Sequence, residues 1–446
     1  MPEKNDTRNW IRNSITIKSI IIGILILVLL IPAGMIRSLI HERNSLRNNV
    51  VNEVSYKWGN PQTIAGPIIT IPYKKFFKKE DKIVESVHYA HFLPEDLNIN
   101  GDLNPEIRYR GIYKVVVYNS VLEFKGKFTK PDFSDWKIPE SNIMWENATL
   151  SIRIPDMRGI KDVIKINWNK NTYDVNPGIN NQNQNYTGVS TFVDFNDEQN
   201  YNFNFVLNLN GSDALNFIPI GKETNISINS TWNTPSFEGS FLPYDRNITE
   251  EGFNAAWKIL HLNRSFPQQW KGDDYNIDDS SFGIKLLLPV DHYQKSLRSV
   301  KYAIMFISLT FLIFFFTEIL NKKRIHPIQY LLVGLGLSIF YTLLVSLSEQ
   351  LSFNLAYLIA SISIISLITV YAHSIFKSIK LTSIVAFVLI ILYGFLFTIL
   401  QLQDYSLLLG SIGLFITLAI VMFLSRKIDW YSNLQEEKEK KNIENE

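Results

Sequence analysis

The sequence contains no cysteine among its 446 residues. Disulfide bonds, thiolate zinc sites, iron–sulfur clusters and cysteine nucleophiles are therefore excluded. The sequence also lacks a G-x-S-x-G elbow, a GxxxxGK[ST] phosphate loop, an H-E-x-x-H zinc helix and an EF-hand loop. The formal net charge is only +2, and no basic stripe with interleaved aromatic residues occurs. We therefore expect no catalytic residues, no cofactor, no metal site and no nucleic-acid partner.

What the sequence does contain is a set of apolar runs of membrane-spanning length. A run of about 20 apolar residues crosses the hydrocarbon core of a bilayer. The first run covers residues 17–36, and five more follow a long polar stretch. Those five lie at about 300–320, 328–348, 353–371, 381–400 and 405–425. The sequence predicts an α-helical integral membrane protein with six transmembrane helices in a 1+5 order and a large inserted domain, residues 37–299.

The first apolar run has two interpretations. A cleaved signal peptide would use Pro32, Ala33 and Gly34 as its small-residue site. However, the apolar stretch 19–36 is longer than the 7–15 residues of a signal-peptide core. We therefore interpret this run as an uncleaved signal anchor.

The distribution of lysine and arginine predicts the orientation in the membrane, because cytoplasmic flanks carry an excess of both. The links 349–352 and 401–404 contain no basic residue. The bases cluster instead in the tails 1–16 and 426–446, at Lys322, Lys323 and Arg324, and at Lys377 and Lys380. This asymmetry predicts that both termini are cytoplasmic and that the large domain is extracytoplasmic.

The large domain shows the alternation of apolar and polar residues that is typical of strands. Residues 203–209, 150–154 and 226–228 carry this signal, and 113–118 is a more continuous apolar strand. We therefore expect a β-rich (α+β) domain with an antiparallel sandwich or barrel-like sheet. A helix continuing from the first span is expected to end at Gly59. A second helix is expected over 249–264, with Asn247 as its cap. The polar stretch 173–200 is interpreted as a long loop or hairpin.

Ionisable residues at membrane depth are costly and therefore informative. Glu318 lies in the last turn of the second span, and Glu349 ends the third. Glu318 is either an interfacial carboxylate that pairs with the bases at 322–324 or a coupling or packing site. No helix centre holds an Asp, Glu, Lys or Arg, which disfavours an ion-coupled transporter. Gly334 and Gly336 are interpreted as a close helix–helix contact.

Short stretches spread over the region between Ile36 and Tyr371 are similar to one known family. They are Arg37–Arg43, Trp58–Gln62, Gly66–Pro67, Arg110–Tyr113, Asp156–Gly159, Trp232–Gly239, Gly252–Trp257, Leu262–Arg264, Arg298–Tyr302, Phe315–Glu318, His326–Tyr330 and Phe340–Leu344. Together they resemble the inner-membrane protein CreD family. The resemblance implies the bacterial inner membrane, a periplasmic domain and a link to cell-envelope integrity. It supplies no catalytic residues.

The candidate functional or structural residues come from these stretches and from the membrane carboxylates. They are Arg37, Glu42, Arg43, Trp58, Arg110, Trp232, Arg264, Arg298, Lys301, Glu318 and Glu349. Arg37, Glu42 and Arg43 stand where the first span leaves the lipid, and Arg298 and Lys301 stand at the outer entrance of the second. If these spans are neighbours, the two clusters form a collar between domain and membrane.

These observations support three functions. The first is a non-enzymatic envelope protein that binds or scaffolds other envelope proteins or components through its periplasmic domain. The second is a transporter or lipid-handling protein with a polar path near Glu318 or Glu349. The third is an envelope enzyme with a catalytic outer domain. The lipid bilayer is the one partner that the apolar runs require.

Overall fold

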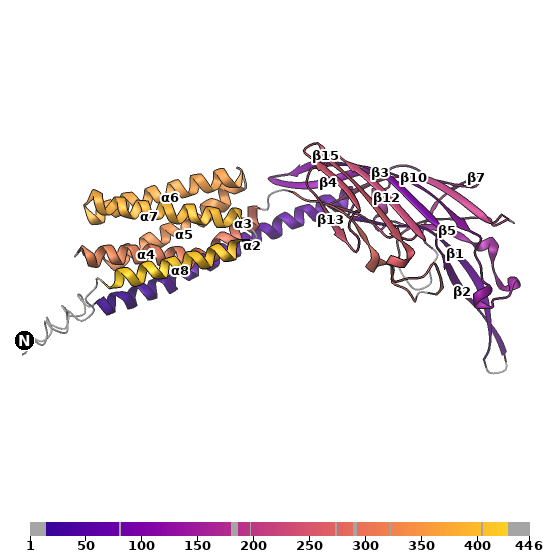
Figure 1. The fold of residues 1–446 in the computed structure, drawn as a ribbon, viewed down its shortest axis with the longest axis horizontal. Helices are drawn as coiled ribbons and strands as arrows, with labels where there is room; N and C mark the ends of the chain where they lie inside the picture. The colour runs from indigo at the N-terminus through magenta and orange to yellow at the C-terminus, as the bar shows by residue number, and fades with distance from the viewer. Residues whose placement is uncertain are drawn as a thin grey trace, which may run out of the picture. The chain divides into compact units, whose positions relative to one another are not determined.

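The computed structural model describes residues 15–79, 82–179, 186–196, 198–272, 274–288, 292–321, 323–402 and 405–426. Most of both tails, and Lys322, lie outside the described residues. The chain forms two compact units (Figure 1). One consists of Met1–Leu46 with Val290–Glu446, and the other of Arg47–Pro289.

The first unit is helical. It holds most of α2 (Ile15–Trp58), followed by α3 (His292–Lys301), α4 (Ala303–Leu320), α5 (Pro327–Ser348), α6 (Phe353–Phe376), α7 (Ile379–Gln401) and α8 (Ser406–Ser425). Among the described helices, five are long and apolar enough to cross a membrane: α2, α4, α5, α6 and α7. The sixth predicted crossing coincides with α8, whose apolar stretch Leu408–Phe423 is shorter. The predicted integral membrane protein, with one helix before a β-rich insert and the others after it, is confirmed.

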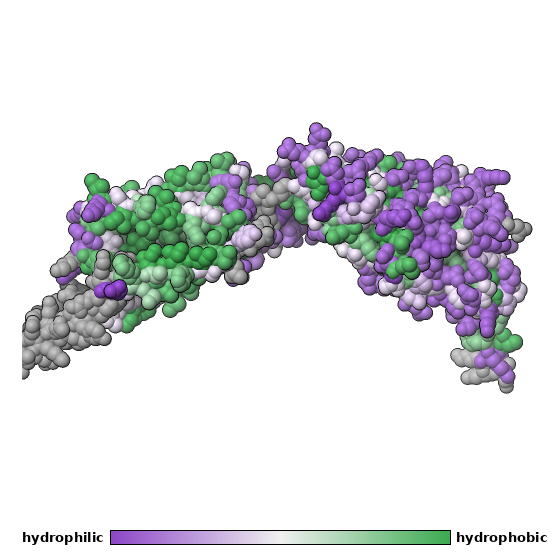
Figure 2. Space-filling model, viewed as in Figure 1, coloured by the Kyte–Doolittle hydropathy of each residue, from purple (hydrophilic) through white to green (hydrophobic). Residues whose placement is uncertain are grey.

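Apolar side chains cover most of the visible face of the helical unit (Figure 2). Val370, Phe387 and Ile390 are all more than half exposed. Soluble proteins rarely expose apolar surface on this scale, whereas lipid tails solvate it. The helices therefore carry two apolar faces, one for their neighbours and one for the bilayer.

Gly334 allows α5 to pack closely. A Cβ atom there would lie 2.1 Å from a methyl carbon of Leu29 in α2 and 2.9 Å from the ring of Phe311 in α4. A Cβ atom at Gly336 would instead make ordinary contacts of 3.9 and 4.0 Å with α6. The interpretation of Gly334 and Gly336 as small residues at helix contacts therefore applies chiefly to Gly334.

The second unit contains a nine-stranded and an eight-stranded sheet among its described residues. The first follows the order β13 (Pro235–Gly239), β17 (Phe282–Leu286), β11 (Ala214–Phe217), β1 (Gln62–Lys79), β5 (Thr149–Arg153), β9 (Gly188–Phe192) and β8 (Asn176–Pro177), and β2 (Lys82–Phe92) pairs with β1 and with β16 (Gln269–Lys271). The second follows the order β14 (Asp245–Thr249), β15 (Gly252–Leu260), β12 (Glu223–Ser230), β3 (Asp96–Arg110), β4 (Tyr113–Thr129), β10 (Asn200–Ser212), β6 (Lys165–Trp168) and β7 (Asn171–Asp174). Most pairs are antiparallel, but β1–β11 and β12–β3 are parallel.

Both sheets contribute to one hydrophobic core. In β10 the side chains of Phe203, Phe205, Leu207 and Leu209 are buried while those between them face outward, as their alternation predicts. Phe205 stacks on Phe124 of β4, with ring centroids 4.6 Å apart. The strands predicted at 150–154, 226–228 and 113–118 correspond to β5, β12 and the start of β4.

The helix predicted over 249–264 is wrong. This segment forms the end of β14, the whole of β15 and the short 3-10 helix η5 (His261–Asn263). Phe253 and Trp257 are four residues apart, which fits a helix, but Ala255 and Ile259 are buried with them. The four therefore follow the two-residue period of a strand. The predicted cap Asn247 lies instead in β14, paired with Asn254.

The polar stretch 173–200 contains the end of β7 and the short strands β8 and β9, with β10 beginning at Asn200. Residues 180–185 and 197 of this stretch lie outside the described residues. A hairpin is the better of the two interpretations, because β8 pairs antiparallel with β9.

Candidate functional site

The last turns of α2 join the β-rich unit at a contact that we call the helix–sheet joint, formed by Glu53, Tyr56, Trp58, Arg108, Arg110, Asp156 and Arg158. The helix ends as predicted, because Gly59 adopts a φ of +147° and its N–H donates to the carbonyl of Ser55 at 2.8 Å. A Cβ atom at Gly59 would lie 2.6 Å from the carbonyl oxygen of Asn210. Only glycine fits this approach of the chain to β10.

Trp58 fixes the end of α2 against β4 and β3. Its indole N–H donates to the carbonyl of Tyr118 at 3.1 Å. The guanidinium of Arg108 lies 3.7 Å from the centre of the Trp58 ring, a cation–π contact. Arg110 contributes an ion pair, with its Nη2 2.8 Å from Oε1 of Glu53. The hydrogen bond from Lys57, supported by the charge of Arg110, lowers the pKa of Glu53.

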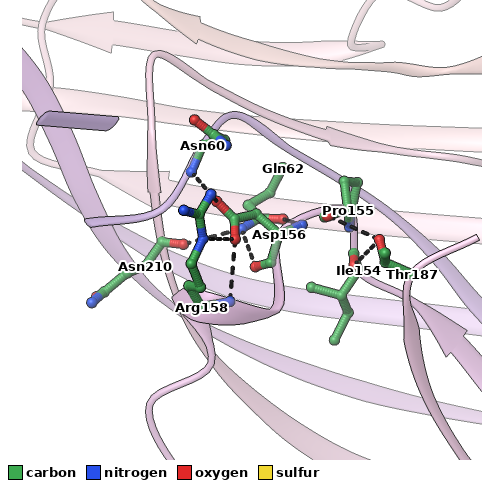
Figure 3. Close-up of polar contacts among 8 residues, drawn as sticks. All are labelled: Asn60, Gln62, Ile154, Pro155, Asp156, Arg158, Thr187 and Asn210. Atoms are coloured by element: carbon green, nitrogen blue, oxygen red, sulfur yellow. Dashed lines mark hydrogen bonds and ion pairs between the residues drawn. The ribbon is translucent and has the colours of Figure 1, made fainter. Parts of the chain in front are cut away.

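Asp156 is the buried centre of the joint (Figure 3). Only 6% of the residue is exposed. Its carboxylate accepts from the backbone N–H of Asn60 at 2.9 Å, from Nε and Nη2 of Arg158, both at 2.8 Å, and from the Arg158 backbone N–H at 3.2 Å. Burial alone would raise the pKa of Asp156, but the hydrogen bonds from Arg158 and Asn60 outweigh it and lower the pKa.

Two further side chains complete this network. The guanidinium of Arg158 stacks 3.7 Å from the ring centre of Tyr56 in α2. Gln62, fully buried at the start of β1, donates to the carbonyls of Asp156 at 2.9 Å and Asn210 at 3.3 Å. The joint therefore links α2, the start of β1, the 3-10 helix η4 (Met157–Gly159) and β10 through buried polar contacts.

The joint brings together three of the sequence stretches that carry the family resemblance. They are Trp58–Gln62, Arg110–Tyr113 and Asp156–Gly159. Trp58 and Arg110 were predicted as candidates, whereas Gln62, Asp156 and Arg158 were not. The available signal was the presence of Asp156 and Arg158 within one matched stretch, but nothing in their spacing shows that they are buried.

Arg264 is buried in a different part of the β-rich unit, with 9% of the residue exposed. Its guanidinium donates to the carbonyls of Phe266 at 2.6 Å, Pro267 at 3.0 Å and Ile220 at 3.4 Å. Burial lowers the pKa of Arg264 to about 10. Its hydrogen bonds go to backbone carbonyls and to the side chain of Gln268, which is typical of a brace for a loop.

Trp232 has a similar bracing contact. The side chain is half-buried against the hydrophobic core, and its indole N–H donates to the carbonyl of Leu287 at 3.2 Å. This contact ties the start of β13 to the end of β17.

Glu318 lies at the C-terminal end of α4 and is only 2% exposed. Its carboxylate pairs with Nζ of Lys18 at 2.7 Å and accepts from the hydroxyl of Tyr330 at 2.9 Å. The backbone N–H of Ile325 donates to it at 3.3 Å. Among the described side chains, the ion pair thus joins α4 to α2, and not to Lys323 or Arg324 as one interpretation of the sequence expected.

A cavity of about 550 Å³ lies beside this ion pair. Its lining combines apolar side chains of α2 with polar ones of α5 and of the α4–α5 link. The lining residues include Ile17, Ile21, Ile22, Arg324, His326 and Gln329.

Glu349 is half-buried at the other end of α5 and accepts from the hydroxyl of Tyr293 in α3 at 3.0 Å. The 22 residues of α5 separate it from the contacts of Glu318. At 1.5 Å per residue this is about 33 Å. The two carboxylates therefore do not form one site.

The two clusters of the predicted collar lie on α2 and α3. Arg37, Glu42 and Lys301 are exposed, and Arg43 and Arg298 are half-buried. Among the described residues, no ion pair or hydrogen bond joins the clusters. Burial, and to a smaller extent the charge of Arg298, lowers the pKa of Lys295, which lies one turn earlier in α3. The collar stays a prediction.

Within the described part of the chain, no group of three His, Asp or Glu side chains is placed to hold a metal ion. His91 is buried and lies 3.0 Å from the hydroxyl of Thr70, and its ring packs against Trp270. His88 contacts Ser86 at 3.1 Å. Both histidines have ordinary structural partners.

Comparison with known proteins gives one consistent result. The model of the family described as "Inner membrane protein CreD" matches residues 14–431. The inner membrane protein CreD of Escherichia coli (strain K12) is 36% identical over 415 residues, which cover 91% of this chain and 92% of that protein.

Proposed function

Because the chain belongs to the CreD family of inner membrane proteins, we propose that it is a non-catalytic envelope protein whose β-rich domain binds or scaffolds other envelope components. The proposal includes the orientation, with the β-rich domain in the periplasm and both termini in the cytoplasm. The distribution of lysine and arginine supports this orientation.

The observation that carries the proposal is the location of the family-like stretches in the β-rich unit. Three of them meet at the helix–sheet joint, and Gly252–Trp257 borders an open pocket of about 480 Å³ that Asp102 and Glu251 also line. The buried charged groups Asp156 and Arg264 are both held by structural hydrogen bonds, those of Arg264 chiefly to backbone carbonyls. Catalytic groups instead face a space that a substrate can enter.

Transport or lipid handling is the second candidate, because the Lys18–Glu318 pair borders a cavity with an apolar wall. The transport candidate ranks second because the two carboxylates are far apart. Glu318 contacts the first turn of α5, whereas Glu349 lies at the C-terminal end of α5. A relay of protons or ions needs ionisable groups along the path between them.

Substituting the two carboxylates separates the candidates. In a strain that lacks this protein, we expect Glu349→Gln to restore the envelope barrier as fully as the wild type. Glu318→Gln removes the partner of Lys18, so we expect it to reduce the amount of folded protein. We expect the loss of barrier function to match this loss of folded protein and not to exceed it. The measurements are leakage of a periplasmic marker and the size-exclusion profile of the purified protein.

Glu146→Gln, which changes an exposed carboxylate of the β-rich unit, is the control. If Glu318→Gln or Glu349→Gln gave a normal yield of folded protein but no barrier function, the scaffold proposal would fail and a carrier would be favoured.

A further inference from the structure

Strands β1 and β2 continue beyond the sheet as a two-stranded arm. β1 pairs with β5 only up to Thr70, and β2 pairs with β16 only from Ala90 onward, but β1 and β2 pair with each other as far as Lys79 and Lys82. We call Lys74–Lys79 with Lys82–Val87 the hairpin arm. Its six residue pairs extend about 20 Å at 3.3 Å per residue. Figure 1 shows the end of β2 projecting from the β-rich unit.

Apolar side chains are exposed near the end of the arm. Phe76 is 50% exposed, Phe77 44%, Ile83 78% and Val84 37%. Figure 2 shows apolar surface there, on a unit that is otherwise mostly polar. A ribbon of two strands is only marginally stable in water, and clustered exposed apolar residues indicate a binding surface.

The apolar residues occupy both faces of the arm. Phe77 pairs directly with Val84, so these two side chains share one face. Phe76 and Ile83 are diagonal neighbours on the other face, since Phe76 pairs with Glu85 and Lys78 with Ile83. A protein groove or a second sheet would cover one face. A medium that surrounds the end of the arm would cover both.

Lysines flank these apolar residues. The sequence 74–85 holds Lys74, Lys75, Lys78, Lys79 and Lys82 against three acidic residues. Lys74 pairs with Glu85 at 2.9 Å, and Lys75 and Lys82 are exposed. Lysine stems pack along apolar groups while their ammonium groups reach phosphate, and basic side chains are attracted to anionic lipid surfaces.

We propose that the hairpin arm binds an anionic phospholipid surface, with Phe76, Phe77, Ile83 and Val84 in the interfacial region and Lys75 and Lys82 at the phosphates. The charge and the two-faced apolar pattern favour a bilayer over a protein partner. This inference goes beyond the proposed function and does not depend on it, because it requires only that the arm reach a lipid surface.

The absence of cysteine makes a direct test possible. Val84→Cys in the full chain, labelled with a polarity-sensitive fluorophore, is placed in phosphatidylcholine nanodiscs. Vesicles of phosphatidylcholine with phosphatidylglycerol are then added. We expect a blue shift and an intensity rise that are absent with pure phosphatidylcholine vesicles and that high salt reduces. Adding Phe76→Ser and Phe77→Ser should weaken the response at least about tenfold, and Lys75→Gln with Lys82→Gln should also weaken it.

The same label at Asn254→Cys, an exposed position in β15, is the control and should not respond. An unchanged thermal melt shows that the serine variants remain folded. The proposal is overturned if anionic vesicles give no shift, if both vesicle types give the same shift, or if the serine variants respond like the parent. A shift caused only by a purified envelope protein would identify a protein partner instead.

Discussion

Asp156→Ala is expected to lower the free energy of unfolding of the β-rich unit by about 2–3 kcal/mol. The carboxylate accepts two backbone and two guanidinium hydrogen bonds in a site that water barely reaches. Its removal leaves the Asn60 N–H without this acceptor and the charge of Arg158 uncompensated. Chemical denaturation of the full-length protein in detergent, followed by tryptophan fluorescence, measures the change.

Asp174→Ala provides the control, since Asp174 is an exposed residue of β7. Such a surface change should stay within about 0.5 kcal/mol. If both substitutions had equally small effects, the helix–sheet joint would contribute little to stability.

The lowered pKa of Asp156 gives this prediction a pH dependence. A carboxylate whose pKa is lower in the folded state stabilises the fold above its unfolded pKa of about 3.9. This contribution is lost as the pH falls through the folded pKa. The difference between wild type and Asp156→Ala should therefore be constant near neutrality and shrink in acid below pH of about 4.

Arg264→Ala is expected to destabilise the same unit by about 3 kcal/mol, because the carbonyls of Phe266, Pro267 and Ile220 lose their donor. Arg264→Lys should recover only part of this loss, since an ammonium group cannot reproduce the planar arrangement of guanidinium N–H donors. The same denaturation experiment measures both variants.

Arg246→Ala, at an exposed position of β14, is the matched control and should change the unfolding free energy by about 0.5 kcal/mol or less. Equal stability of Arg264→Ala and Arg246→Ala would contradict the bracing role of Arg264.

The sequence predicted those parts of the fold that depend on local pattern. The apolar runs predicted the membrane helices because length and composition alone decide whether a helix suits lipid. The strict alternation in β10 predicted a half-buried strand. The helix prediction for 249–264 was wrong because the spacing of Phe253 and Trp257 fits both the helical period and the two-residue period of a strand. Only the burial of Ala255 and Ile259 as well shows that the segment is a strand.

The sites depended on contacts that no local pattern reveals. Lys18 and Glu318 are 300 positions apart, and their pairing follows from the packing of α2 on the later helices. Asp156 meets Asn60 only because the antiparallel pairing of β1 with β5 brings these distant segments together. Sequence analysis could therefore name Trp58, Arg110 and Glu318 as candidates but could not name the partners that explain them.

We propose that the β-rich domain is exported while both ends of the chain stay in the cytoplasm. The chain has no native cysteine, so a single introduced cysteine reports on one side of the membrane. The two positions are Lys125 in β4 and Lys323 between α4 and α5. Both positions are exposed. The measurement is labelling of spheroplasts with a membrane-impermeant maleimide. Our account predicts that Lys125→Cys reacts in intact spheroplasts and that Lys323→Cys reacts only after lysis. Labelling of Lys323→Cys with protection of Lys125→Cys would contradict it.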